Sequence, residues 1–255
     1  MTSSSPVARR VLVTGGSRGI GAATCHAFAA LGDAVAIHCS TNREAAEAVL
    51  AELPGSGHVV VQGDLRDAAA VKAMVDAAAA ALGGLDVLVN NAGVFVDHHV
   101  EETTYEQWQE AWSDTIGVNL VGAANASWCA LQHMPRDGSA RIVNVGSRGA
   151  FRGEPRSPAY GASKAALAAF GQSLAKSLGA SGVSVATVAP GFVETDMAAE
   201  LLDGPGGEAI RGDSPFGRVA RPDEVADAVV YLASPQAQWA SGAILDLNGA
   251  SYLRM

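Results

Sequence analysis

The sequence has few cysteines, no long apolar run and no long run of one charge. Its three cysteines, Cys25, Cys39 and Cys129, are odd in number and lack metal-ligand spacing, so we expect buried thiols, without metal, and assign them no chemistry. No apolar stretch approaches the roughly 20 residues of a bilayer span, and the first residues do not resemble a signal peptide. We therefore expect a cytoplasmic protein with no membrane partner.

The formal charge of −9 is spread along the chain without a basic stripe, which argues against nucleic acid as a partner. No internal repeat is present. A length of 255 residues with 49% apolar content is sufficient for one large core. We expect a flexible tail over residues 1–8 and a single domain over residues 9–255.

Short apolar runs alternate with helical stretches along the whole chain. This order predicts right-handed crossovers and an α/β fold, a doubly wound Rossmann-type domain with a parallel sheet of about seven strands. The runs expected to form strands are Arg9–Thr14, Ala34–His38, His58–Gln62, Leu85–Asn90, Arg141–Gly146, Val183–Ala189 and Ala243–Leu247.

The first strand leads into a glycine-rich turn, and an alanine-rich helical stretch follows. Strand, glycine turn and helix form the order of a phosphate-binding site, because glycines allow close backbone approach and free N–H groups begin the helix. The spacing Gly-x-x-x-Gly-x-Gly departs from the usual Gly-x-Gly-x-x-Gly dinucleotide pattern. The candidate cofactor residues here are Gly15, Ser17, Arg18, Gly19, Ile20 and Gly21.

The end of the second strand lacks an acidic residue. A carboxylate there would accept a hydrogen bond from a free ribose 2′-hydroxyl and repel a 2′-phosphate. The chain instead has Ser40, Thr41 and Asn42, with positive charge at Arg18 and Arg43, which favours NADP(H) as the cofactor. The alternative is that these are only turn and N-cap residues.

Asp64 and Leu65 follow the third strand, where we expect the adenine edge. Small residues after the fourth strand, Asn91, Ala92 and Gly93, let the backbone approach a ligand. The segment 192–217, interrupted by glycines at 204–207, is expected to form a substrate lid.

Tyr160 and Lys164 stand four residues apart at the start of an apolar, alanine-rich helix, so both project from one face. A cation beside the phenol is expected to lower the tyrosine pKa from its usual value near ~10 and to fit it for proton exchange with an alcohol or ketone. Ser147 follows a buried strand, at the edge where ligands bind. Taken alone, the Tyr–Lys pair is equally typical of an exposed helical face. Asn119 alone is typical of a buried amide with a structural role.

Together these motifs resemble, in order and over nearly the whole chain, the short-chain dehydrogenase/reductase family. The resemblance is carried by Thr14-Gly15-x-x-x-Gly19-x-Gly21, Asn90-Asn91-Ala92-Gly93, Asn119, Ser147, Tyr160-x-x-x-Lys164 and Pro190-Gly191.

The resemblance implies a role for each matching position. It implies that Tyr160 is the acid/base, that Ser147 binds the substrate oxygen and that Lys164 binds the nicotinamide ribose and depresses the tyrosine pKa. It further implies that Asn119 holds a water of the proton relay. Asn91, Ala92 and Gly93 would line the cofactor, with Pro190, Gly191, Val193 and Thr195 near the nicotinamide.

Within the family, three segments look most like 3-oxoacyl-carrier-protein reductases, although sugar, steroid and small-alcohol dehydrogenases are similar there. The arginines by which such reductases dock an acidic carrier protein have no counterpart at Gly138 and Ser181. An alternative function from a different class is a nucleotide-sensing regulator that binds a dinucleotide without turnover. The presence of Asn119, Ser147, Tyr160 and Lys164 argues against this alternative. The apolar surface of segment 160–178, with the resemblance, predicts a homotetramer or dimer acting on a small carbonyl or alcohol.

Overall fold

The computed structural model describes residues 8–254, so that nearly all of the predicted tail, 1–8, lies outside the described residues. Seven strands form one parallel sheet in the order β3-β2-β1-β4-β5-β6-β7. This is the predicted doubly wound α/β fold, and the predicted strands are confirmed to within two residues at each end. The strands are β1 Arg10–Val13, β2 Ala34–Cys39, β3 Val59–Gln62, β4 Val87–Asn90, β5 Arg141–Val145, β6 Ser184–Pro190 and β7 Ile244–Leu247.

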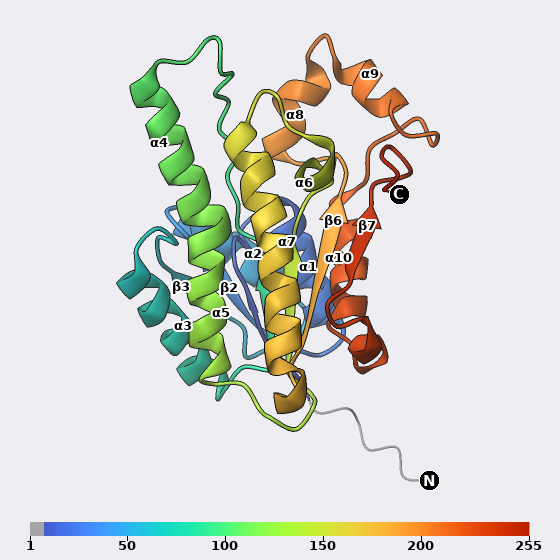
Figure 1. Ribbon diagram of the computed structural model, residues 1–255. Helices are drawn as coiled ribbons and strands as arrows, with labels where there is room; N and C mark the ends of the chain where they lie inside the picture. The colour runs from blue at the N-terminus through green and yellow to red at the C-terminus, as the bar shows by residue number, and fades with distance from the viewer. Residues whose placement is uncertain (1–7, 255) are drawn as a thin grey trace.

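Helices cover both faces of the sheet (Figure 1). The first face carries α1 Gly19–Ala30, α2 Arg43–Glu52 and α10 Pro222–Leu232, whose apolar side chains join one core cluster. The other face carries α3 Ala68–Leu82, α5 Ala123–Leu131 and α7 Pro158–Leu178. The remaining elements are α4 Tyr105–Ile116, the π-helical turn η1 Gly117–Gly122, α6 Gly149–Arg152, η2 Gly179–Ser181, α8 Asp196–Asp203, α9 Gly207–Gly212 and η3 Pro235–Ala240.

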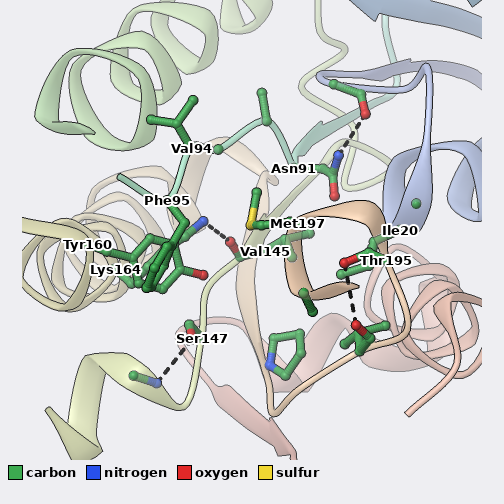
Figure 2. Close-up of a pocket in the computed structure, with 18 of the residues that line it drawn as sticks. Ile20, Asn91, Val94, Phe95, Val145, Ser147, Tyr160, Lys164, Thr195 and Met197 are labelled. Atoms are coloured by element: carbon green, nitrogen blue, oxygen red, sulfur yellow. Dashed lines mark hydrogen bonds between the residues drawn. The ribbon is translucent and has the colours of Figure 1, made fainter. Parts of the chain in front are cut away.

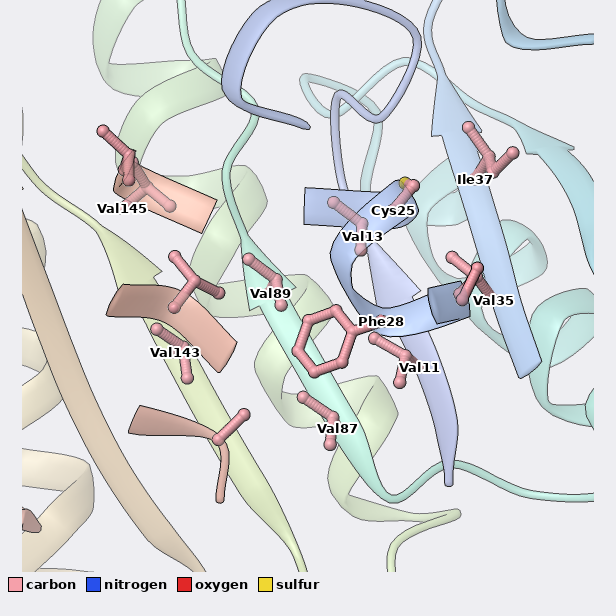
Figure 3. Close-up of a cluster of buried hydrophobic side chains, with 14 of the residues drawn as sticks. Val11, Val13, Cys25, Phe28, Val35, Ile37, Val87, Val89, Val143 and Val145 are labelled. Atoms are coloured by element: carbon pink, nitrogen blue, oxygen red, sulfur yellow. The ribbon is translucent and has the colours of Figure 1, made fainter. Parts of the chain in front are cut away.

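Strand side chains alternate between the two cores. Val11 and Val13 of β1 point to the first core, shown in Figure 3, and Leu12 between them points to the second. Because helices cover both faces, the five inner strands of the sheet are buried on both sides, which explains why they are continuous apolar runs instead of alternating polar and apolar residues. The edge strands β3 and β7 are partly exposed.

The chain reverses its direction of progress across the sheet between β1 and β4, which are neighbours. In open α/β sheets ligands bind at such a reversal, outside the carboxyl ends of the strands. The glycine turn follows β1 and the Asn91–Gly93 segment follows β4, so the topology brings two of the predicted cofactor segments together.

Two regions show more helical detail than the sequence predicts. The helical stretch expected from Glu106 onward is α4 and α5 joined by the π-helical turn, which carries Asn119. The segment 192–217 contains two short helices, α8 and α9, separated at Gly204–Gly206 as the glycines predicted. Its apolar residues form a small separate cluster around Leu202 and Val219.

Candidate active site

A cavity of about 1680 Å³ opens at the carboxyl ends of the strands. It is lined by the glycine turn, the ends of β2 to β6 and the segment 192–217. Every residue that the sequence nominated for the site lines this cavity except Asn119. Figure 2 shows the part of the cavity where Ser147, Tyr160 and Lys164 lie.

The glycine turn is shaped by close backbone contacts. Gly15 has a φ of +63°, and a Cβ there would lie 2.9 Å from the Ala92 Cα. A Cβ on Gly21 would lie 2.0 Å from the Gly15 carbonyl oxygen. Only glycine fits at both positions. The turn therefore keeps an open backbone cradle before α1, which is what a pyrophosphate requires, despite the unusual glycine spacing.

Thr14 and Asn91 fasten this turn to the end of β4. The Thr14 hydroxyl accepts hydrogen bonds from the backbone N–H groups of Asn91 and Ala92, both at 3.0 Å. The Asn91 amide donates to the carbonyl oxygens of Thr14 and Gly15, at 2.9 and 3.0 Å (Figure 2). The Asn91 side chain thus holds the wall of the cofactor site and leaves contact with a cofactor to its backbone.

His38 was not nominated from the sequence, yet it links both sides of the adenosine end of the cavity. Its Nδ1 accepts from the Gly15 N–H at 3.0 Å, and its Nε2 lies 2.9 Å from the Gly63 carbonyl oxygen. The ring must therefore be neutral, with its proton on Nε2. Burial lowers the pKa of His38 and favours this form. The sequence signal that could have identified His38 was its position at the end of the second predicted strand, next to the candidate residues 40–42.

The ribose end of the cavity has hydroxyl groups, an amide and one nearby cation. Ser40, Thr41 and Asn42 line it, and the Asn42 oxygen also caps α2 by accepting from the Ala45 N–H at 2.9 Å. The Asn42 oxygen is therefore an N-cap, as the alternative interpretation from the sequence held. The Asn42 amide nitrogen has no acceptor within the described residues. Arg18 lines the cavity and lies 3.7 Å from Asp196.

Arg43, the other cation considered, points away from this end. It pairs with Glu47 at 2.8 Å, one turn along α2, and does not line the cavity. Among residues 38–43 no carboxylate is present, as the sequence shows.

Asp64 and Leu65, where the sequence predicts the adenine edge, line the cavity beyond the end of β3. Arg66 donates to both Asp64 carboxylate oxygens, at 2.8 to 3.1 Å, and reaches Asp114 on α4 at 2.9 Å. The Arg66 side-chain hydrogen bond holds the pKa of Asp64 below its usual range. Asp64 is therefore an ionised acceptor at this edge of the cavity.

Tyr160 and Lys164 come from the first two turns of α7 and meet the end of β5. The Lys164 Nζ donates to the Val145 carbonyl oxygen at 2.9 Å and lies 5.7 Å from the centre of the Tyr160 ring (Figure 2). Phe95 packs edge-on against the same ring at 5.1 Å. The Ser147 hydroxyl lies at the end of β5 and accepts from the Gly149 N–H at 3.0 Å.

The protonation of this pair differs from the expectation that Lys164 lowers the tyrosine pKa. Burial raises the pKa of Tyr160 to about 12, opposed by the Ser147 hydroxyl and reinforced by the charge of Glu154. Burial also lowers the pKa of Lys164 to about 8. Desolvation disfavours both charged forms, and the ammonium is directed at a backbone carbonyl instead of the phenol oxygen.

Asn119 is completely buried, behind the cavity wall. Its amide oxygen accepts from the Val94 N–H at 2.8 Å, and its amide nitrogen donates to the Val94 carbonyl and the Ser163 hydroxyl, both at 3.0 Å. Both amide N–H groups are therefore used within the protein. The Asn119 side chain fixes the Val94 segment. Only the backbone carbonyl of Asn119 or the second lone pair of its amide oxygen could then contact a relay water.

The predicted nicotinamide segment closes the far side of the cavity. The Gly191 N–H donates to the Leu247 carbonyl at 3.0 Å, which holds Pro190 and Gly191 to β7. Thr195, at the start of α8, faces Gly19 of the glycine turn, since a Cβ on Gly19 would lie 3.1 Å from the Thr195 methyl group. The first part of segment 192–217 therefore reaches across to the phosphate end.

Arg148, Arg152, Glu154 and Asp213 also line the cavity and were not nominated. Glu154 occupies the space left by Gly149, where a Cβ would lie 2.4 Å from its carboxylate. Burial raises the pKa of Glu154. Three of these four residues lie between Ser147 and Tyr160 in sequence, which was the signal for them.

A Rossmann-type sheet, a glycine cradle at its reversal point and a buried Tyr–Lys pair beside a strand-end serine define the class of dinucleotide-dependent oxidoreductases. A model of the short chain dehydrogenase family matches residues 9–205. The chain therefore belongs to the short-chain dehydrogenase/reductase family. Among residues 8–254, no helix has both the length and the apolar character needed to cross a membrane.

Individual relatives cover nearly the full chain. The cis-4-hydroxycyclohexanecarboxylate dehydrogenase of Sinomonas cyclohexanicum is 41% identical, with 94% of this chain and 95% of that protein covered. The 3-oxoacyl-[acyl-carrier-protein] reductase of Vibrio cholerae is 36% identical, covering 95% and 96%. A short chain dehydrogenase from Burkholderia cenocepacia, solved in complex with NADP, superposes with a TM-score of 0.86 at 37% identity, covering 95% of this chain and 97% of that one.

Proposed function

We propose that this protein interconverts a ketone and a secondary alcohol with NADP(H), using Tyr160 as the proton donor and acceptor. The observation that carries the proposal is that Tyr160, Lys164 and Ser147 converge on the same cavity as the glycine cradle. A hydride donor and a proton donor must meet at one carbonyl, and this cavity has room for both.

When bound, NADPH supplies the hydride. The glycine turn and the N-terminus of α1 would hold its pyrophosphate, and Asp64 its adenine edge. The Ser147 hydroxyl would orient the substrate oxygen, where negative charge develops during reduction, and the Tyr160 phenol would transfer its proton to that oxygen. Lys164, held by Val145, is placed to bind the nicotinamide ribose and to stabilise a phenolate electrostatically. Asn119 would position the Val94 segment and with it a proton relay.

A preference for NADPH over NADH is part of this proposal. It is supported by the absence of a carboxylate at residues 38–43, by the hydroxyl groups of Ser40 and Thr41, and by Arg18 on the cavity wall. The Burkholderia relative was solved with NADP. Because Arg18 is exposed and near Asp196, we expect a moderate preference and not an absolute one.

The cofactor proposal is tested by kcat/KM for NADPH and NADH in the wild type and in Arg18→Ala. We expect the wild type to favour NADPH and the variant to raise KM for NADPH several-fold more than KM for NADH. Arg43→Ala is the matched control, since Arg43 pairs with Glu47 outside the cavity and should leave the ratio unchanged. Equal kcat/KM for the two cofactors in the wild type contradicts the preference.

The substrate is proposed to be a small ketone or alcohol taken up beneath a lid formed by segment 192–217. A 3-oxoacyl thioester is one candidate class, and sugar, steroid and small-alcohol substrates are the others. The relatives named above act on a hydroxycyclohexanecarboxylate and on a 3-oxoacyl group, by their names. A panel of ketones and alcohols monitored by NADPH absorbance tests this; binding of NADPH without turnover of any member would favour a nucleotide-sensing regulator.

A homotetramer or dimer in the cytoplasm completes the proposal. It is supported by the partly exposed apolar residues along α7, among them Ala162, Ala166, Ala169 and Phe170. A helix that needed only one buried face would carry polar residues at such positions.

A further inference from the structure

The part of the cavity beyond Ser147 carries a group of four charged side chains, here called the arginine cluster: Arg148, Arg152, Glu154 and Asp213. Arg148 follows Ser147 directly, and its backbone N–H donates to the Pro190 carbonyl at 2.8 Å. Asp213 belongs to segment 192–217, just after α9. The cluster thus joins the serine loop to the proposed lid.

Arg148 is only 3% exposed, yet its guanidinium has few partners. It stacks on the Phe192 ring at 5.1 Å and donates one hydrogen bond, from Nη2 to the Asp213 carboxylate at 3.3 Å. A guanidinium has five N–H groups. Within residues 8–254 the remaining donors on Nε and Nη1 have no acceptor. Burial, together with the charge of Arg152, lowers the pKa of Arg148, because a buried cation is unstable without compensating anions.

The carboxylates of the cluster, Asp213 and Glu154, supply only part of that compensation, because the pKa of Arg148 stays lowered in their presence. Asp213 is shared, since Arg152 lies at the same distance of 3.3 Å from the same oxygen. The Glu154 carboxyl forms no ion pair or hydrogen bond within the described part of the chain, and burial raises its pKa, which favours its neutral form. Two guanidiniums therefore share one oxygen of the Asp213 carboxylate, and both arginines line the cavity.

We propose that Arg148, assisted by Arg152, binds a carboxylate group of the substrate, so that the substrate is a compact keto acid or hydroxy acid. This rests on the proposed oxidoreductase function and names its substrate class. Ser147 and Arg148 line the same cavity, so we infer that the carboxylate bound by Arg148 and the carbonyl held by Ser147 belong to one compact molecule. A planar guanidinium with free donors suits bidentate contact with a carboxylate.

The test compares 4-oxocyclohexanecarboxylate with its methyl ester, which has the same ketone and no charge, in the presence of NADPH. We expect the wild type to favour the acid at least tenfold in kcat/KM. Arg148→Gln should reduce this ratio to near one, mainly through KM for the acid, so that kcat/KM for the acid falls at least fivefold more than kcat/KM for the ester. Arg156→Gln is the matched control, since Arg156 pairs with Asp97 at the exposed rim of the cavity.

Two results would overturn the inference: a wild-type ratio at or below one, or equal loss for acid and ester in Arg148→Gln, which would mean that Arg148 only fastens the lid through Asp213. Turnover of the ester shows separately that the oxidoreductase function holds. If Arg148→Gln does not fold, or neither ketone is reduced, calorimetry of the wild-type protein with NADPH decides. Cyclohexanecarboxylate must then bind at least tenfold more tightly than cyclohexanecarboxamide, and equal affinities refute the proposal.

Discussion

Burial governs the two side chains at the centre of the cavity. Lys164 meets the end of β5 at Val145, and the Tyr160 ring packs against Phe95. Burial moves the pKa of each toward its neutral form. A phenol that keeps its proton suits ketone reduction, in which Tyr160 donates that proton. Alcohol oxidation requires phenolate, so we expect oxidation to increase with pH more steeply than reduction.

Tyr160→Phe should remove turnover and leave NADPH binding nearly unchanged, because only the transferable proton is deleted. General acid–base groups contribute about 10²-fold or more to kcat. The measurements are kcat by NADPH absorbance and the NADPH Kd by fluorescence. Tyr231→Phe, at an exposed site on α10, is the control. A Tyr160→Phe protein with more than about a tenth of the wild-type kcat would refute the assignment.

His38 should make the protein less stable in mild acid. Burial, the largest cause, lowers its folded-state pKa below the unfolded value near ~6.5, opposed by its Gly63 hydrogen bond and by Asp64. In this range the unfolded chain binds the extra proton, so the free energy of unfolding falls as pH drops from ~6.5 toward the lowered folded-state pKa. The protonated ring would also lose its acceptor for the Gly15 N–H, so NADPH affinity should weaken over the same range.

Urea unfolding and NADPH titration at several pH values between about 5 and 8 check this, in wild type, His38→Gln and the surface control His26→Gln. Loss of His38 should flatten the pH dependence by at most about 1.4 kcal/mol per pH unit. An unchanged slope in His38→Gln, with the same slope in the control, would show that other groups cause it.

At the scale of single elements, the π-helical turn Gly117–Gly122 and segment 192–217 matter most for the site. The turn carries Asn119, which completes the hydrogen bonding of Val94 on the cavity wall. Single π-helical turns are frequent at functional sites, where they redirect a side chain. The segment, in contrast, joins the first core only through Val193 and otherwise has a small apolar cluster and two short helices.

Asn119→Ala should destabilise the protein by about 1 to 3 kcal/mol, because it leaves the Val94 backbone groups without their partner and removes one of the two hydrogen bonds of the Ser163 hydroxyl. We also expect kcat to fall, since Phe95, next to Val94, packs on the Tyr160 ring. Urea unfolding and steady-state kinetics measure the two effects. A change of unfolding free energy below about 0.5 kcal/mol with normal kcat would contradict this role.

Segment 192–217 should open more easily than the sheet. With little apolar burial outside its own cluster, its backbone amides are expected to exchange hydrogen much faster than those of β4 and β5, and to become protected when NADPH binds. Hydrogen exchange followed by mass spectrometry, with and without NADPH, tests this. Protection equal to that of the sheet without cofactor would argue against a lid.

At the scale of the whole molecule, both faces of the sheet are buried but large apolar side chains remain on the outer surface. Trp128 on α5 is 61% exposed and Trp239 on η3 is 99% exposed. In Figure 1, α4, α5 and α7 form one outer layer. Exposed apolar patches on such a layer are typical of protein interfaces.

Light scattering at micromolar concentration should therefore give two or four times the chain mass of 25.9 kDa. Ala169→Glu places a charge on the exposed side of α7 and should lower that mass, since burying an unpaired carboxylate at an interface is unfavourable. Glu110→Gln on the exposed side of α4 is a mild control. A stable wild-type monomer would remove the expectation.

The sequence alone indicated the strands, the doubly wound fold and the family of this protein. Apolar runs predicted all seven strands, and the inner strands gave the clearest runs because strands covered on both faces must be continuously apolar. The glycine turn, the Tyr160–Lys164 spacing and Ser147 are local patterns, and local geometry places them correctly at the carboxyl end of the sheet.

The tertiary structure alone decided what depends on contacts between distant segments. Gly15 and His38, Val94 and Asn119, and Arg148 and Asp213 are 23, 25 and 65 residues apart, and no local pattern indicates such pairs. Burial likewise follows from packing. Burial raises the pKa of Tyr160, whereas the neighbour at position 164 alone suggested that this pKa falls. The Lys164 ammonium is directed at the Val145 carbonyl and not at the phenol oxygen.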